Sequence, residues 1–176
     1  MAWRCYQLTY ELQSRLHIGC HKVGNLQRTR YYVPARNLWA AVTEALTRSG
    51  FAPGGIPAGD YQKIGRWVQE HCAFTYFYIL EGDRLLAPRY VNGKLCYGDL
   101  PVPDFERRYL DSMAGTALEP QQTAAKTGSL HEVEFISLYP LDGGATWNRT
   151  RLRGWIFVDD GAYALWPQIR QALEDL

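Results

Sequence analysis

Residues 12–43 read LQSRLHIGCHKVGNLQRTRYYVPARNLWAAVT and contain neither Asp nor Glu. The formal net charge of the 176-residue chain is only +1, so this stretch holds a strong local excess of positive charge. Clustering of basic residues identifies a binder of polyanions better than the net charge of the whole protein does. We therefore interpret residues 12–43 as a surface for a polyanion, and its residue types favour RNA.

Basic and aromatic side chains are interleaved in this acid-free stretch. Arginine guanidinium groups match phosphate oxygens, and tyrosine rings offer faces on which unpaired bases can stack. The alternative is a solvated basic loop with Tyr31 or Tyr32 in the core, since adjacent strand residues face opposite ways. The RNA-binding residues predicted here are Arg15, His17, His21, Lys22, Arg28, Arg30, Tyr31, Arg36 and Asn37.

A second basic strip lies nearer the C-terminus. Residues 141–154 read LDGGATWNRTRLRG, and no acid occurs between Asp142 and Asp159. We interpret Trp147 as a stacking platform and Arg149 as a phosphate contact. The alternative is a loop that leads into a strand whose alternate residues are exposed to solvent.

Hydrophobic periodicity divides the chain into strands and helices. Residues 3–12 alternate in polarity, which predicts a half-buried strand that continues through Ile18 and stops at Gly19. Pro34 suits the first turn of a helix that ends at Gly50. We further expect a helix capped by Asp60, a central strand over 73–80 and a hairpin with a type I′ turn at Asn92-Gly93. A short helix over 104–113 follows. Strands over 129–139, with Glu132 and Glu134 facing solvent, and over 152–158 then precede a final helix.

The order of these elements predicts an α+β fold. We interpret residues 82–128 as an insertion. Without it the order is β-α-β-β-α, which is a ferredoxin-like (RRM-like) split βαβ sheet lacking its last strand. We expect a single domain over residues 1–176. A partner could supply the missing strand, the hairpin could substitute for it, or the chain could be shortened.

Three segments resemble the RAMP superfamily, the RNA-binding subunits of CRISPR effector complexes. Residues 12–19 (LQSRLHIG) and 32–41 (YVPARNLWAA) resemble the family's opening, a strand ending in S-P-L-H-I-G, a variable loop and then Y-I-P-G-S-S-L-x-G-A. Residues 123–134 (TAAKTGSLHEVE) are similar to a second family segment, which enters the sheet after a thumb-like insert.

The resemblance implies an RRM-like domain that grips guide RNA within a type III-like complex, without catalysis. The Leu-Trp-Ala-Ala variant over 38–41 is similar to members that hold the 5′ end of the guide. The chain departs from the family pattern at Arg15, which replaces a proline, and at residues 35–37, which replace Gly-Ser-Ser. It also lacks the Gly-rich loop that family members carry before a last strand, and the loop over 20–29 lacks the Asp of target-cleaving subunits.

Two other functions remain open at this point. His17 or His21 could act in general acid–base cleavage of a guide precursor, as a metal-independent endoribonuclease. Alternatively, the chain could be a structural subunit that touches no RNA. The expected partners are guide RNA and other effector subunits.

A metal site is the remaining chemical possibility. His17, Cys20 and His21 could meet His71 and Cys72, but this spacing matches no common zinc module, and Cys72 enters an apolar strand. We therefore expect neither metal nor cofactor. The N-terminus lacks the pattern of a signal peptide and no apolar run approaches bilayer length, so we expect a cytoplasmic protein without a membrane partner.

Overall fold

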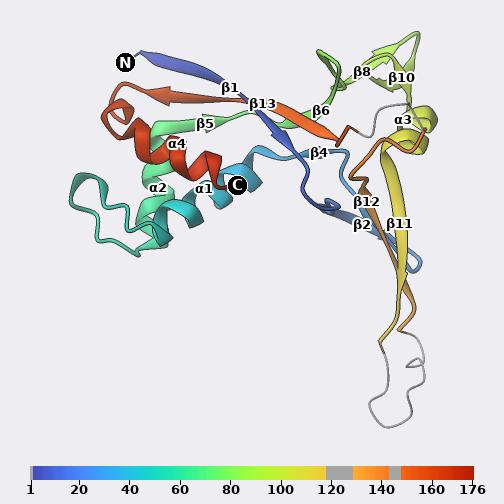
Figure 1. The fold of residues 1–176 in the computed structure, drawn as a ribbon, viewed down its shortest axis with the longest axis horizontal. Coiled ribbons are helices and arrows are strands. Elements are labelled where there is room, and N and C mark those ends of the chain that lie inside the picture. The colour runs from blue at the N-terminus through green and yellow to red at the C-terminus, as the bar shows by residue number, and fades with distance from the viewer. Residues whose placement is uncertain (1, 118–128, 143–147) are drawn as a thin grey trace. The chain divides into compact units, whose positions relative to one another are not determined.

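The computed structural model describes residues 2–117, 129–142 and 148–176 and shows an α+β protein (Figure 1). Its strands are β1 (Trp3–Glu11), β2 (Gly19–Val23), β3 (Leu26–Thr29), β4 (Tyr32–Val33), β5 (Cys72–Phe74), β6 (Phe77–Glu81), β7 (Arg84–Leu85), β8 (Pro88–Val91), β9 (Lys94–Tyr97), β10 (Leu100–Pro101), β11 (Leu110–Gly115), β12 (His131–Ile136) and β13 (Arg151–Asp159). Its helices are α1 (Ala35–Arg48), α2 (Tyr61–His71), α3 (Val102–Tyr109) and α4 (Trp166–Glu174), with short 3-10 turns at Pro53–Gly55 and Tyr163–Leu165.

The chain divides into two compact units. The first unit consists of the described residues of 1–9, 33–77 and 153–176, and the second consists of those of 10–32 and 78–152. The predicted insertion over 82–128 falls within the second unit, which also includes residues 10–32. The largest sheet has the strand order β1-β13-β6-β4, with β5 also paired to β13 and β7 to β6.

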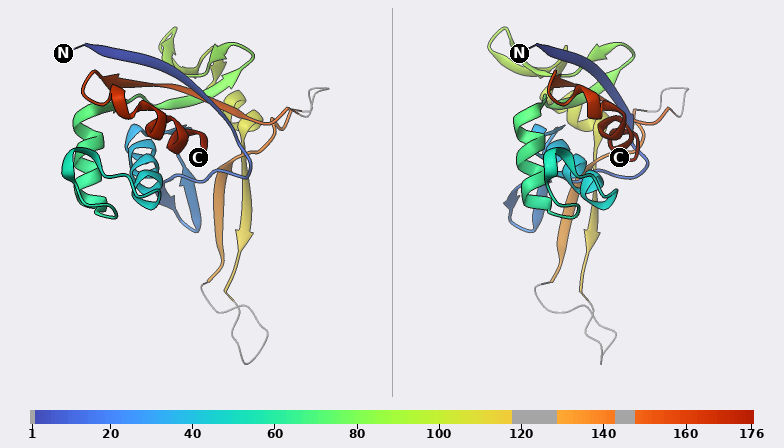
Figure 2. Two further views of the ribbon diagram at one scale, coloured as in Figure 1. Left: turned by 60° about the vertical axis from the view of Figure 1, so that its left-hand side comes forward. Right: turned by 90° about the vertical axis from the view of Figure 1, so that its left-hand side faces the viewer.

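The first unit is built around a helical layer and the strands that it covers. Figures 1 and 2 show α1, α2 and α4 gathered on one side of β1, β5 and β13. β5 pairs antiparallel with β13, with Phe74 opposite Ile156. The core contains fully buried apolar side chains from helices and strands, including Val42, Ile64, Ile156 and Ile169. Burial of this apolar surface is the main force that stabilises the unit.

Local sequence signals place the first two helices of this unit. α1 begins directly after Pro34, whose extended backbone suits that position, and Ser49 forms its C-cap. Asp60 caps α2 by accepting a hydrogen bond from the backbone N–H of Lys63 at 3.1 Å. Both predicted helices are therefore confirmed.

The second unit contains two further sheets and α3. One sheet has the strand order β11-β12-β3-β2, and the other has the order β10-β9-β8. β11 and β12 are antiparallel, whereas β12 and β3 are parallel. The turn between β8 and β9 has positive φ at both Asn92 (50°) and Gly93 (76°), as a type I′ turn requires, so the predicted hairpin is confirmed.

Two predicted strands differ from the observed ones. The first strand ends at Glu11, and Gly19 begins β2 instead of ending a strand. Between them, Leu16 exchanges both backbone hydrogen bonds with Ile136 of β12, which fixes this segment in another sheet. Pairing with a distant strand thus overrides the local alternation.

The apolar strand predicted over 73–80 is interrupted. Thr75 separates β5 from β6, and its hydroxyl accepts a hydrogen bond from the N–H of Trp155 at 2.8 Å. The N–H of Thr75 also donates to the Trp155 carbonyl at 2.9 Å. A side-chain oxygen therefore takes the place of a backbone carbonyl in the ladder. The short helix predicted over 104–113 is likewise divided, into α3 and the start of β11.

Candidate nucleic-acid interface

One face of the β11-β12-β3-β2 sheet presents a row of side chains from all four strands. Lys22 pairs with Gln27, Gln27 with Val133, and Val133 with Met113, so the four side chains point to the same face. Lys22 and Gln27 are exposed, and Met113 is 55% exposed. The row is therefore an open surface that combines one cation, one amide and apolar groups.

Arg15 adds a second cation to this face. Its guanidinium carbon lies 4.8 Å from the centre of the Phe135 ring, and Nη1 donates to Sδ of Met113 at 3.4 Å. Neither Arg15 nor Lys22 forms an ion pair with a carboxylate among the residues that the structure describes. Asp111 is exposed on the same face at its β11 edge. We call Arg15, Lys22, Gln27, Met113 and Val133 the sheet-face strip.

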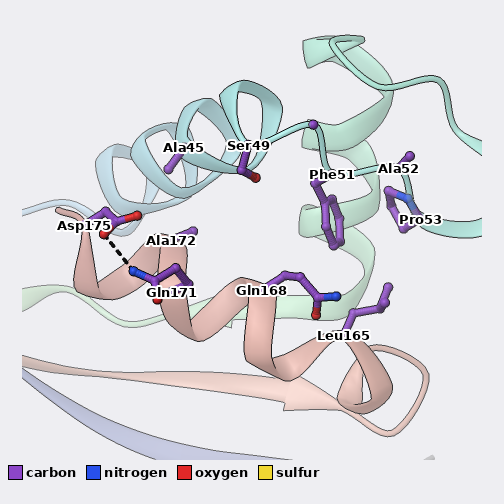
Figure 3. Close-up of a pocket in the computed structure, with 11 residues that line it drawn as sticks. Ala45, Ser49, Phe51, Ala52, Pro53, Leu165, Gln168, Gln171, Ala172 and Asp175 are labelled. Atoms are coloured by element: carbon purple, nitrogen blue, oxygen red, sulfur yellow. Dashed lines mark hydrogen bonds between the residues drawn. The ribbon is translucent and has the colours of Figure 1, made fainter.

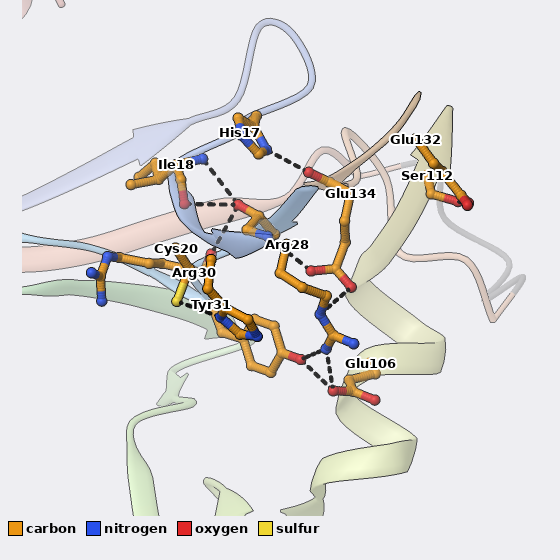
Figure 4. Close-up of polar contacts among 12 residues, drawn as sticks. His17, Ile18, Cys20, Arg28, Arg30, Tyr31, Glu106, Ser112, Glu132 and Glu134 are labelled. Atoms are coloured by element: carbon orange, nitrogen blue, oxygen red, sulfur yellow. Dashed lines mark hydrogen bonds and ion pairs between the residues drawn. The ribbon is translucent and has the colours of Figure 1, made fainter. Parts of the chain in front are cut away.

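Arg28 lies on the opposite face of the sheet, within a cluster of polar side chains (Figure 4). Its Nε lies 3.1 Å from Oε1 of Glu134 in β12, and its Nη2 lies 3.1 Å from Oε1 of Glu106 in α3. Nη2 also donates to the hydroxyl of Tyr31, which in turn donates to Glu106. We call Arg28, Tyr31, Glu106 and Glu134 the Arg28 cluster. Two carboxylates therefore compensate the charge that the sequence suggested was free for RNA.

The cluster also perturbs the titration of its members. Burial raises the pKa of Tyr31 well above its ordinary value, and the hydrogen bond to Glu106 raises it further. Burial would lower the pKa of Arg28, but the nearby Tyr31 and the carboxylates of Glu134 and Glu106 outweigh it and raise the pKa. Arg28 is therefore held as a cation in this cluster.

Glu134 is the buried centre of this arrangement, with 8% of its surface exposed. Its Oε2 accepts a hydrogen bond from the backbone N–H of Thr29 at 2.9 Å, in addition to the ion pair with Arg28. The expectation that Glu134 faces solvent is wrong, because Arg28 and Tyr31 cover that face of β12. Glu132 is exposed as expected, and Ser112 donates to it.

The two histidines of the acid-free stretch are both exposed. Nδ1 of His17 lies 2.6 Å from the Glu134 carbonyl, which fixes a proton on Nδ1 and leaves Nε2 as the acceptor of the neutral ring. Nδ1 of His21 lies 3.3 Å from Sγ of Cys20.

The other residues of the second unit that were predicted to bind RNA interact with neighbouring side chains of the protein. Arg30 is half-buried, and its Nη1 donates to the hydroxyl of Tyr32 at 3.4 Å. The Tyr31 ring packs against Phe105 with 5.4 Å between ring centres. Arg149 donates to Gln13 and lies 3.6 Å from Glu11. The predicted platform Trp147 lies outside the described residues.

Arg36 and Asn37 belong to the first unit, in the first turn of α1, and both are exposed. Arg36 lines a pocket of about 360 Å³ together with Ala35, Trp39, Gln69, Cys72 and Phe74. The sequence analysis singled out Arg36 and Asn37 but gave Trp39 no role in binding. The i, i+4 spacing of Ala35 and Trp39 was the available signal that they share a face.

A second pocket of about 350 Å³ also lies in the first unit (Figure 3). The end of α1, the following loop and α4 form its walls. Phe51, Pro53 and Leu165 supply apolar surface, while Gln168 and Asp175 supply polar groups. Its acid makes it less suitable for a phosphate than the pocket beside Arg36.

His71, which the sequence considered as a metal ligand, is held by an acid of the first unit. Its Nδ1 lies 2.9 Å from Oδ2 of Asp159, which is 1% exposed. Burial would raise the pKa of Asp159, but hydrogen bonds from His71 and from the N–H groups of Ala162 and Gly161 outweigh it and lower the pKa. Cys72 is buried, as expected for a core residue, and burial raises the pKa of its thiol to about 12.

Within residues 2–117, 129–142 and 148–176, no group of three or more His, Cys, Asp or Glu side chains is placed to hold a metal ion. None of the helices in these ranges has the length and apolar character needed to cross a bilayer. The sequence matches no protein-family model. No curated protein matches it either.

Proposed function

We propose that this chain is a non-catalytic RNA-binding subunit of a CRISPR ribonucleoprotein. The observation that carries the proposal is the sheet-face strip, in which the exposed Arg15 and Lys22 have no carboxylate partner among the described residues. When such cations pair with phosphates, counterions condensed on the nucleic acid are released. This release is the main source of affinity for a nucleic-acid backbone.

The surroundings of the two cations favour a single strand over a duplex. Met113 is contacted by Arg15, and Val133 is separated from Lys22 only by Gln27 in the row, so apolar surface is available beside the charges. Unpaired bases can bury their faces on such a surface, whereas the bases of an A-form duplex are stacked inside the helix. Gln27 offers an amide that can accept from or donate to a base edge.

The RAMP resemblance supplies the setting of the proposal. In that setting the chain adopts a ferredoxin-like arrangement, acts in the cytoplasm and joins other effector subunits, one of which completes an open sheet edge. β2 is an edge strand whose five residues are all exposed, so its outer backbone groups are available to a partner strand. The guide RNA, through its 5′ end in the family's manner, is the proposed ligand of the sheet-face strip.

The test is equilibrium binding of a fluorescent single-stranded RNA as a function of salt. We expect the double variant Arg15→Ala, Lys22→Ala to weaken binding by about tenfold or more at low salt and to reduce the salt slope. Arg107→Ala is the matched control, because it removes a cation from α3 that Asp104 already pairs at 2.9 Å. Equal affinity of the double variant and the wild type would refute the proposal.

A second function is favoured by the geometry of His17. The bond from Nδ1 to the Glu134 carbonyl leaves Nε2 free to act as a base toward a ribose 2′-hydroxyl. A metal-independent endoribonuclease would cleave guide precursor in EDTA, and His17→Ala would abolish the cleavage while His21→Ala would test the second histidine. Intact precursor after prolonged incubation of the wild type would exclude this function.

A further inference from the structure

The pocket beside Arg36 combines features that suit a ligand with a flat ring and a negatively charged group. Its six lining residues come from the start of α1, the end of α2 and β5, and none of them is acidic. Its volume of about 360 Å³ lies within the range of roughly 300–1,000 Å³ that is typical of small-molecule sites.

We propose that this pocket binds one unpaired nucleotide, with the base against Trp39 and Phe74 and the phosphate at Arg36. The proposal rests on the RNA-binding function proposed above and names the part of the RNA that this site would take. The pocket is formed by residues of the first unit alone, whereas the sheet-face strip belongs to the second.

The aromatic wall of the pocket is held in place before any ligand arrives. The indole N–H of Trp39 donates to the Gly65 carbonyl at 2.9 Å. The ring also packs so closely on Gly65 that a Cβ there would lie 3.0 Å from Cζ2 of Trp39. A rigid ring loses little conformational freedom when a base stacks on it, and base–aromatic stacking is tolerant of base identity.

The polar groups of the pocket are available to a ligand. Arg36 and Gln69 are exposed, and neither makes a side-chain hydrogen bond or ion pair within the described part of the chain. A guanidinium can bind two phosphate oxygens at once, and an amide can pair with a base edge. Inorganic phosphate would use only Arg36, and an apolar ligand would use neither group, so a nucleotide satisfies the whole lining.

The experiment is calorimetric titration of the full chain with the four ribonucleoside 5′-monophosphates, and with inorganic phosphate for comparison. We expect at least one monophosphate to bind more tightly than phosphate does. Arg36→Ala should weaken that binding by about tenfold, as expected for loss of a charged hydrogen bond. Phe74→Leu, which keeps apolar volume without the ring, should weaken it by about fivefold.

Arg66→Ala is the matched control, because Arg66 is an exposed arginine of α2 that does not line the pocket. Circular dichroism would establish that each variant is folded. The inference is overturned if no monophosphate binds, if phosphate binds equally well, or if Arg66→Ala weakens binding as much as Arg36→Ala does. If no monophosphate binds but the sheet-face strip still binds RNA, only the inference about the pocket is refuted. If a monophosphate binds but RNA does not, only the proposed RNA-binding function is refuted.

Discussion

Arg28 and Arg36 belong to the same acid-free stretch, yet the fold places them in opposite electrostatic settings. Arg28 lies 3.1 Å from both Glu106 and Glu134, carboxylates contributed by α3 and β12. Arg36 is exposed in the first turn of α1 beside a pocket without acidic lining residues. A local excess of charge in the sequence thus divides into one arginine that stabilises the fold and one that is available to a ligand.

The largest expected effect is on stability, at Arg28. Arg28→Ala leaves the buried Glu134 without its cation, so we expect the free energy of unfolding to fall by about 3 kcal/mol or more. Chemical denaturation measures this change, and Arg107→Ala is the control, with an expected loss below about 1 kcal/mol at an exposed ion pair. A stability loss no larger than that of the control would show that Arg28 is as free as Arg36.

Asp159 is a second charge that a partner compensates, and its effect on stability depends on pH. Because the pKa of Asp159 is lower in the folded state than its ordinary 3.8, its contribution is present above that value and is lost as the pH falls toward the lowered pKa. Asp159→Asn should cost about 1–3 kcal/mol at neutral pH and flatten the loss of stability in acid. Urea melts between pH 2 and 5 would reveal this, with Asp104→Asn, from the more exposed ion pair with Arg107, as the control. Equal dependence of the unfolding free energy on pH in both variants would contradict it.

At Arg36 the expectation is reversed. Arg36→Ala should change the free energy of unfolding by less than about 0.5 kcal/mol, because the exposed side chain contacts no charged partner in the described residues. Its RNA affinity should nevertheless fall. Parallel denaturation and RNA-binding measurements on this variant separate the two effects, and a large stability loss would erase the contrast with Arg28.

The smallest expected effect is on the salt dependence of RNA binding. Removal of one phosphate contact by Lys22→Ala should reduce the slope of log affinity against log salt by about 0.7 for a single strand. Arg28→Ala, measured where the variant remains folded, should leave the slope unchanged because Arg28 is already paired. An unchanged slope for Lys22→Ala would mean that Lys22 contacts no phosphate.

Elements with local signals were predictable from the sequence. Pro34, Asp60 and the Asn92-Gly93 pair each determine backbone geometry within a few residues, and the structure agrees at all three. The interruption at Thr75 was not predictable, because it depends on a hydroxyl that meets Trp155 from a distant strand. Local patterning contains no information on such a partner.

The sequence predicted which residue types make up the candidate site, but not which side chains contact or align with one another. Alternation assigned Glu134 to solvent because a half-buried strand usually has one wet face. In the fold, Arg28 and Tyr31 cover that face, and Glu134 is buried among them. The exposure of Lys22 was expected, whereas its alignment with Gln27, Val133 and Met113 depends on strand register, which the sequence did not specify.

The Arg28 cluster also constrains the order in which the protein can fold. Arg28 and Glu106 are separated by 78 residues, and Thr29 and Glu134 by 105. Contacts between residues so far apart form slowly, because a long loop must close before they give any stabilisation. During synthesis, residues 12–43 leave the ribosome before either carboxylate exists. The nascent chain therefore carries Arg28 without either of its carboxylate partners until Glu106 has been made.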